Sequence, residues 1–408
     1  MSTNIYVLRQ PILDANRETF AYELLLRDTR FHSQIQNMSH TTAELLKSAL
    51  DKFGVKALLG KYKAFIKIDK KFLMHETIYT LPVGKFIFSI DANIEIDDSV
   101  VLRVKDLHKK GYILAINDTY INREVMQSLS NILRYISYLK IDIKTEENNL
   151  MLLENYKIKK IFTEVESHKM YEKAKSFNYS YLQGYFFSKP KIAQQESFNP
   201  VHLKAIELCN LLMSDAKIDK VVSAFEEAPT ITLQVLKFIN SSYFTFHYHI
   251  SSLKQVLTLM GREHLTQLLM LILYSSSFEK RTEKGSPLMH LAKSRTDLMV
   301  EAAKKIAQEE CEAFVSKAHF VGLISLMDAL LNLSMETILN RLNVEEEIKE
   351  ALLQNRGLLG EIYIFAKSIE HFDVKAIESF SNKYHFNLED FEKLTIQVLE
   401  NTNKLDEI

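Results

Sequence analysis

The chain has 408 residues, of which 47% are hydrophobic and 25% charged, and its formal net charge is -1. This length predicts about two or three globular domains, and the near-neutral charge indicates no dedicated nucleic-acid-binding surface. No apolar run approaches the roughly 18 residues of a membrane span, and the first residues lack the order of a signal peptide, so we expect a cytoplasmic protein. Cys209 and Cys311 form no C-x-x-C pair, which favours two core residues over a zinc site or a disulfide.

Short β-type runs alternate with longer helical patterns through the first 190 residues. The runs are residues 6–8, 64–68, 85–90, 112–116, 138–141, 159–162 and 181–183. Most successive runs are separated by roughly 20 to 26 residues, which is typical of β/α units around a mainly parallel sheet. The first half of the chain is therefore predicted to be an α/β domain.

Polar residues follow these runs almost every time. In chain order they are Lys67 and Asp69, Asp91, Asn117 and Asp118, Lys140 and Asp142, and Glu164 and Glu166. In a β/α barrel the functional site forms at the carboxyl ends of the strands, so the pattern predicts one ring of charged groups. The alternative is that strand ends are polar simply because loops follow them.

The last run, residues 181–190, surrounds one amide and one glycine with aromatic residues. A buried Gln183 amide without partners would cost about 1–3 kcal/mol, so it is expected to be hydrogen-bonded. Gly184 would let another backbone or a ligand approach closely. The alternative is an ordinary aromatic core strand.

Together these stretches resemble an EAL domain, the barrel family of cyclic di-GMP phosphodiesterases. The residues that carry the resemblance are Gln10-Pro11-Ile12, the Tyr22-Glu23-Leu24-Leu25-Leu26-Arg27 stretch at the naming motif, Leu139-Lys140-Ile141-Asp142, Val165-Glu166 and Gln183-Gly184-Tyr185. The resemblance implies a TIM-like barrel over residues 1–195. It also implies a ligand site made of Glu23, Arg27, Asp118, Lys140, Glu166 and Gln183.

The chain departs from the family pattern at the positions that would hold metal. Hydrolysis needs carboxylates that converge on two divalent cations. Here Lys67 stands at an asparagine, Ser89 at a glutamate, Asn117 at an aspartate and Thr163 at a glutamate, while Asp91 lies on the same strand face as Ser89. We therefore expect no bound metal and no hydrolysis.

Two alternatives stay open for the barrel. Arg27 could pair with a phosphate and Gln183 could read a guanine edge, which would make the barrel a receptor for cyclic di-GMP instead of an empty scaffold. If the barrel is active, it is a weak phosphodiesterase that uses Mg²⁺ or Mn²⁺. Its metal ligands would then be Glu23, Asp118 and Glu166, with Lys140 orienting water.

The second half of the chain reads as all-helical from His202, after a polar linker at residues 191–199. Residues 235–261 and 320–331 resemble an HDOD domain, a helical relative of HD phosphohydrolases in bacterial signalling, which implies a domain over residues 196–408. The sequence contains no His-Asp dipeptide, so we expect no hydrolase here. His319, Asp328, His247 and His249 are not expected to bind metal. Asn240 and Ser241 are expected to tie down a helix end, with partner contact as the alternative.

These patterns together predict a bacterial signal-transduction protein that acts by binding. The partner would be a protein bound through the helical domain, and cyclic di-GMP could bind in the catalytically degenerate barrel. A homodimer is also compatible with the sequence.

Overall fold

The computed structural model describes residues 5–28, 42–119, 121–153, 156–177, 179–190, 200–214, 216–240, 250, 252–276, 286–307, 312–342 and 344–405. The chain divides into two compact units, Met1–Phe186 with Asn387–Ile396, and Phe187–Phe386 with Gln397–Ile408. The boundaries expected from the sequence, 1–195 and 196–408, stay a prediction. Each unit is described by itself.

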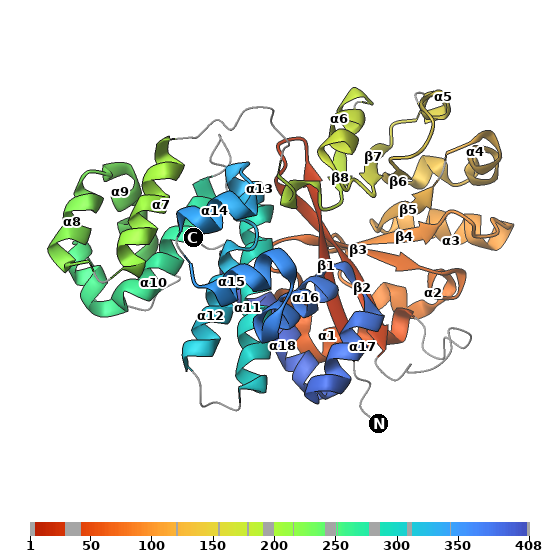
Figure 1. Cartoon of the computed structure of the whole chain (residues 1–408). Helices are drawn as coiled ribbons and strands as arrows, with labels where there is room; N and C mark the ends of the chain where they lie inside the picture. The colour runs from red at the N-terminus through yellow and green to blue at the C-terminus, as the bar shows by residue number, and fades with distance from the viewer. Residues whose placement is uncertain are drawn as a thin grey trace. The chain divides into compact units, whose positions relative to one another are not determined.

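Eight strands of the first unit form a closed barrel in chain order (Figure 1). They are β1 (Ile5–Asp14), β2 (Thr19–Asp28), β3 (Lys63–Ile68), β4 (Phe86–Asp91), β5 (Ile113–Thr119), β6 (Tyr138–Asp142), β7 (Lys159–Thr163) and β8 (Tyr181–Gln183). β1 is antiparallel to both β2 and β8, and all other neighbours are parallel. The predicted α/β barrel is confirmed.

The sequence analysis missed β2 as a strand, because its residues were interpreted only as a motif. β2 follows β1 through a tight hairpin in which the Asp14 carboxylate accepts hydrogen bonds from the backbone N–H groups of Asn16 and Glu18, at 2.9 and 3.0 Å. Aspartate stabilises turns in this way because its short side chain reaches the backbone two or more residues ahead. The hairpin reverses the chain and makes β1 the antiparallel strand of the barrel.

Helices of 3 to 18 residues lie between the strands of the barrel, and one further turn, η4, follows β8. They are α1 (Thr42–Leu59), α2 (Lys70–Met74), η1 (Glu76–Thr80), α3 (Asp98–Lys109), α4 (Arg123–Leu129), η2 (Leu133–Tyr135), α5 (Glu147–Leu150), η3 (Met151–Leu153), α6 (His168–Ser176) and η4 (Phe186–Ser188). Asp69 caps α2 by accepting a hydrogen bond from the Phe72 N–H at 2.7 Å. Asp69, which follows β3, therefore has a capping role in addition to its position at a strand end.

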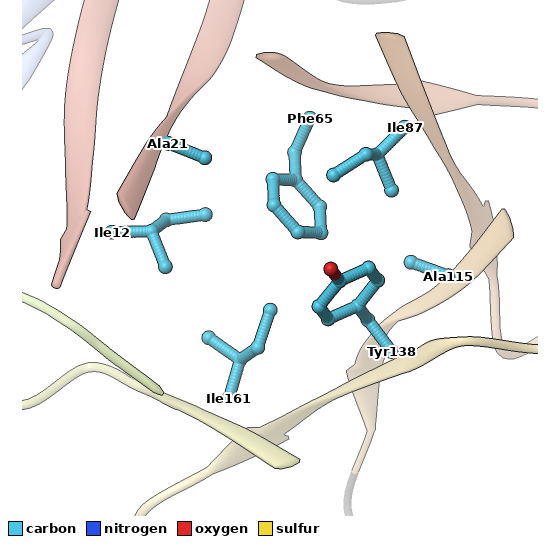
Figure 2. Close-up of a cluster of buried hydrophobic side chains, with 7 residues drawn as sticks. All are labelled: Ile12, Ala21, Phe65, Ile87, Ala115, Tyr138 and Ile161. Atoms are coloured by element: carbon cyan, nitrogen blue, oxygen red, sulfur yellow. The ribbon is translucent and has the colours of Figure 1, made fainter. Parts of the chain in front are cut away.

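A layer of apolar side chains fills the inside of the barrel. Figure 2 shows its members pointing toward one another from seven strands: Ile12, Ala21, Phe65, Ile87, Ala115, Tyr138 and Ile161. Beside this layer, the Phe20 and Tyr181 rings stack with their centroids 4.0 Å apart. The barrel interior is thus a packed core, as expected for this architecture, and any site must lie beyond one end of it.

The second unit has helices and no strands among its described residues. Its elements are α7 (Pro200–Met213), α8 (Ile218–Glu226), α9 (Pro229–Ile239), α10 (Leu253–Ser276), α11 (Pro287–Ile306), α12 (Glu312–Ile324), α13 (Met327–Leu331), α14 (Met335–Arg341), α15 (Glu346–Lys349), η5 (Glu350–Gln354), α16 (Gly357–His371), α17 (Val374–Tyr384) and the second part of α18 (Leu388–Lys404). The predicted all-helical second half is confirmed.

Two stretches of this unit have the length and apolar composition of membrane spans. They are Leu253–Tyr274 and Glu312–Leu331, with mean hydropathies of 1.3 and 1.5. Neither stretch is an unbroken apolar run, because charged residues such as Lys254 and Lys317 interrupt them. In each stretch 56% of the apolar window is buried inside the structure, as in the core helices of globular domains.

Candidate functional site: the polar layer of the barrel

A ring of polar side chains lies directly beyond the apolar layer. Successive inward-facing residues of a strand are two positions apart, so the next inward position on each strand follows from the apolar layer and Tyr181. These positions are Gln10, Glu23, Lys67, Ser89, Asn117, Lys140, Thr163 and Gln183. We call these eight residues the polar layer. It contains three of the site residues implied by the EAL resemblance, Glu23, Lys140 and Gln183, together with the four substituted positions, Lys67, Ser89, Asn117 and Thr163.

Three of the predicted site residues meet in one cluster. The Lys140 ammonium lies 2.6 Å from Glu23 Oε1, and Gln183 Nε2 donates to Glu23 Oε2 at 2.5 Å. All three side chains are buried, with Lys140 only 1% exposed. Both oxygens of the Glu23 carboxylate are therefore engaged by groups of the protein itself.

A fourth member of this cluster, Gln10, was not predicted. Its Oε1 accepts a second hydrogen bond from Gln183 Nε2, at 2.7 Å. Gln10 and Glu23 are paired across β1 and β2, and Ile12 is paired with Gln183 across β1 and β8. Gln10 stands two residues before Ile12, so the two side chains face the same side of β1. That Gln10 lies beside Glu23 follows only from the register of the hairpin between β1 and β2.

The cluster keeps the Glu23 carboxylate charged. Burial alone would raise the pKa of this group, but the Lys140 ammonium, the hydrogen bonds from Lys140 and Gln183, and the charge of Lys67 together hold the pKa of Glu23 below its ordinary value. A buried carboxylate with a cationic partner behaves in this way because the partner stabilises the charged form.

On β3, the strand next to that of Glu23, Lys67 pairs with Asp91. Lys67 Nζ lies 3.2 Å from Asp91 Oδ2, and both side chains are partly exposed, at 54% and 38%. Burial would raise the pKa of Asp91, but hydrogen bonds from the Asn93 backbone and from Lys67 lower it. The lysine that replaces the family's asparagine thus pairs with the acid that follows Ser89 on β4.

The remaining positions of the layer are neutral and buried. Ser89, Asn117 and Thr163 are 0%, 1% and 4% exposed. Within the described part of the chain, Ser89 Oγ and Gln183 Oε1 have no hydrogen-bond partner. The layer therefore offers polar groups toward the barrel mouth without adding negative charge.

Glu166 lies in the loop after β7 and holds that loop to the loop after β8. Its Oε1 accepts a hydrogen bond from the Tyr185 N–H at 3.3 Å. Val165 N–H donates to the Gln183 carbonyl, and Phe186 N–H donates to the Val165 carbonyl, both at 3.1 Å. Glu164, the first residue after β7, has a left-handed backbone with φ of 59°.

Gly184 is required where these two loops meet. Its φ is +147°, and a Cβ atom at this position would lie 2.2 Å from the Val165 carbonyl oxygen. The close approach predicted for Gly184 is made by another part of the backbone.

Several predicted residues fall outside the described part of the chain. The side chains of Arg27 and Asp118 are not described, although their backbones belong to β2 and β5. Ser241, His247, His249 and Cys311 are likewise outside the described residues. Their predicted roles stay predictions.

The described residues of the barrel mouth do not fit a two-metal site. Hard divalent cations require several anionic oxygen ligands. Among the described residues, no group of three or more histidine, cysteine, aspartate or glutamate side chains could hold a metal ion. Glu23 is closed off by Lys140, and Asp91 by Lys67. Because the Asp118 side chain is not described, the expectation of no metal stays a prediction.

In the helical unit, Asn240 ties the end of α9 to a later segment. Its amide donates to the Leu236 and Ile250 carbonyls, both at 2.7 Å, and its Oδ1 accepts from the Ile250 N–H at 2.8 Å. Burial and then the charge of Lys293 lower the pKa of His319 to about 3, so its imidazole stays neutral, and the expectation that it binds no metal stays a prediction. Burial raises the pKa of the Cys209 thiol to about 12.

Comparisons with known proteins agree with this two-part organisation. The family model of the HDOD domain matches residues 197–356. The chain is 26% identical over 405 residues to "Cyclic di-GMP phosphodiesterase CdgJ" of Vibrio cholerae, covering 96% of this chain and 91% of that protein. It is also 26% identical over 378 residues to "Uncharacterized protein YuxH" of Bacillus subtilis, covering 90% of each.

Similar solved structures cover about the first half of the chain. One is the FimX EAL domain from Pseudomonas aeruginosa bound to c-di-GMP, with a TM-score of 0.34 and 19% identity over 48% of this chain and 94% of that one. Another is the Bacillus subtilis YkuI protein, with an EAL domain, in complex with c-di-GMP and calcium. Its TM-score is 0.37, and the match is 16% identical and covers 56% of this chain and 72% of that one.

The molecule is therefore a two-domain protein with a closed α/β barrel followed by a helical domain. Its second half carries an HDOD domain. The expected order of an α/β barrel followed by an HDOD domain is confirmed.

Proposed function

We propose that this is a signal-transduction protein that acts by binding and not by hydrolysis. The observation that carries the proposal is the closure of Glu23 by Lys140 and Gln183 inside the barrel. A carboxylate held by an ammonium at 2.6 Å is a poor ligand for a second cation, because the metal would have to displace Lys140 and leave it buried and unpaired.

The charges of the polar layer support the same conclusion. Glu23 contributes one negative charge, and Lys67 and Lys140 contribute two positive charges; Asp91 beyond the layer brings the sum to zero. Phosphodiester hydrolysis by two metals requires excess negative charge to hold them. The polar layer by itself, with two lysines and one glutamate, suits an anionic ligand better than a pair of divalent cations.

Cyclic di-GMP is the ligand that we propose for the barrel. The relative from Vibrio cholerae, matched over nearly the whole chain, is named as a phosphodiesterase of this dinucleotide. The Ser89 hydroxyl and the side-chain Oε1 atom of Gln183, buried without hydrogen-bond partners among the described residues, would gain donors or acceptors from a polar ligand. The helical domain would carry the signal to a protein partner in the cytoplasm.

The proposal is tested by incubating the full chain with cyclic di-GMP and Mg²⁺ or Mn²⁺ and separating the products. We expect no linear dinucleotide. Calorimetry with the same ligand, with and without Ca²⁺, then measures binding. Heat of binding that does not depend on Ca²⁺ supports the receptor, and neither heat nor a shift in melting temperature would leave the barrel as a scaffold.

The alternative is a weak metal-dependent phosphodiesterase, which the name of the Vibrio cholerae relative favours. Its ligands would be Glu23, Asp118 and Glu166. Accumulation of linear dinucleotide that disappears in a Glu23→Ala variant, with circular dichroism showing that the variant is still folded, would establish this alternative and end the non-hydrolytic proposal.

A further inference from the structure

The helical unit contains a large cavity that no part of the barrel site uses. Its volume is about 1170 Å³, and it lies between α7, α8, α10, α12 and residues 342–348. Pockets for small ligands typically measure roughly 300–1,000 Å³. This cavity, which we call the helical groove, is above that range, and a groove between helices is a common seat for another helix.

The floor of the helical groove is apolar. Leu212 and Leu342 are each 2% exposed, and Ile348 is 5% exposed, so they form a packed base. Met213 at the edge is 41% exposed. A methionine side chain adapts its shape to different apolar surfaces, so its position suits contact with a partner side chain.

On each of two walls of the groove, two carboxylates share one lysine; Glu207, Glu227 and Glu345 line the groove, and Glu347 lies beside it. Glu207 and Glu227 both lie 3.1 Å from Lys204 Nζ. Glu345 and Glu347 lie 2.6 and 2.9 Å from Lys317 Nζ. One ammonium neutralises only one of two carboxylates, so each pair keeps an uncompensated negative charge.

Arg262, Lys220 and Glu263 are the other charged residues of the groove, and together they add one positive charge to the two negative charges left by the pairs. The groove therefore keeps an excess of negative charge. Arg262 directs its guanidinium to the backbone carbonyls of Ser214, at 2.7 Å, and Ala216. Lys220 adds one positive charge and Glu263 one negative charge.

One buried polar atom of the groove also points to a ligand. Asn210 donates its amide to the Arg341 carbonyl at 2.7 Å, and its Oδ1 is buried without a hydrogen-bond partner among the described residues. An N–H donor from an occupant would satisfy this oxygen, and lysine or arginine side chains supply such donors.

We propose that the helical groove binds a short amphipathic helix of a partner protein, with an apolar face toward Met213 and the floor and lysine or arginine residues toward the two carboxylate pairs. This inference rests on the proposed function in that it names the surface through which the helical domain acts. The apolar floor would supply burial, and the charged walls would select basic flanks.

The test uses two synthetic 14-residue helical peptides of equal apolar pattern, one with lysine and one with glutamate at every polar position. Fluorescence anisotropy measures their binding to the full chain. We expect the lysine peptide to bind and the glutamate peptide not to bind. Glu207→Gln together with Glu345→Gln should weaken the lysine peptide about fivefold, because each rim charge contributes modestly.

Two controls make this outcome specific. Glu336→Gln with Glu400→Gln changes the net charge equally at exposed positions outside the groove and should leave the affinity unchanged. Met213→Ala, at a position exposed enough to spare folding, should weaken the lysine peptide. Equal loss with both glutamine pairs, an unchanged affinity in the groove variants, or no binding of the lysine peptide would overturn the proposal. Cyclic di-GMP binding and hydrolysis, measured on the same variants, report separately on the proposed function of the barrel.

Discussion

Lys140 and Glu23 form an ion pair inside the barrel, with 2.6 Å between Nζ and Oε1 and side chains that are 1% and 10% exposed. The two residues are 117 positions apart in the chain. Their contact places a cation of the protein against one of the two oxygens of the Glu23 carboxylate.

Replacing Glu23 by alanine should strongly destabilise the barrel. The variant leaves the Lys140 ammonium buried without its partner, which typically costs about 3–5 kcal/mol. The free energy of unfolding is measured by urea denaturation. Glu76→Ala is the matched control, because Glu76 also pairs with a cation, Arg103, but is 80% exposed. The control should lose less than about 1 kcal/mol. Equal losses in both variants would contradict this role of the pair.

The same pair predicts a specific dependence of stability on pH. The pKa of Glu23 is lower in the folded than in the unfolded protein, so its contribution is present above the unfolded pKa, about 4.3. The contribution is lost as the pH falls through the lower folded pKa. The difference in unfolding free energy between the wild type and Glu23→Gln should therefore be constant from pH 7 to about 5.5 and shrink below that. A difference that grows on acidification would refute the direction of the shift.

Replacing Lys67 by asparagine should strengthen binding of Mn²⁺ at the barrel mouth. The change removes a positive charge and releases Asp91 from its 3.2 Å ion pair. Isothermal titration calorimetry should detect an affinity on the order of tenfold higher than that of the wild type. Lys63→Asn, at the opposite end of the same strand, removes the same charge and should have no such effect. If both variants bind Mn²⁺ like the wild type, Lys67 does not exclude the metal.

Replacing Gly184 by alanine should separate the loops that follow β7 and β8. The new Cβ would lie 2.2 Å from the Val165 carbonyl oxygen. Gly84→Ala is the control, since Gly84 also has a left-handed φ of +83° but nothing within 4 Å of the added atom. Thermal unfolding should show a loss about 1–3 kcal/mol larger for Gly184→Ala than for the control. Losses of the same size would mean that backbone conformation alone requires the glycine.

In the helical unit, Arg295 and Glu370 form a buried bidentate pair between α11 and α16, with two nitrogen–oxygen distances of 2.7 Å and both side chains 4% exposed. Arg295→Met should cost about 3–5 kcal/mol, because the Glu370 carboxylate stays buried without its partner. Adding Glu370→Leu should recover much of this loss. Lys304→Met on the same helix breaks an exposed pair and should change the free energy of unfolding by less than about 1 kcal/mol.

The order of strands and helices was predictable from the sequence, because short apolar runs recur between helical patterns and polar residues mark the strand ends. The missed strand was β2, whose apolar residues surround Glu23 and whose direction depends on the hairpin at Asp14. Local pattern also could not separate capping from binding residues. Asp69 follows a strand as a site residue would, but its hydrogen bond to Phe72 shows that it begins a helix.

By itself the sequence determined which residue types face the barrel mouth, since the alternation of a strand places Lys67, Ser89 and Asn117 on the inward face whatever their partners are. Only the tertiary structure decided that Lys140 and Gln183 close off Glu23, that Gln10 joins them, and that Lys67 pairs with Asp91. The physical reason is that these contacts join different strands of a closed barrel. Their distances depend on strand register and barrel closure, which are properties of the whole sheet and not of any one segment.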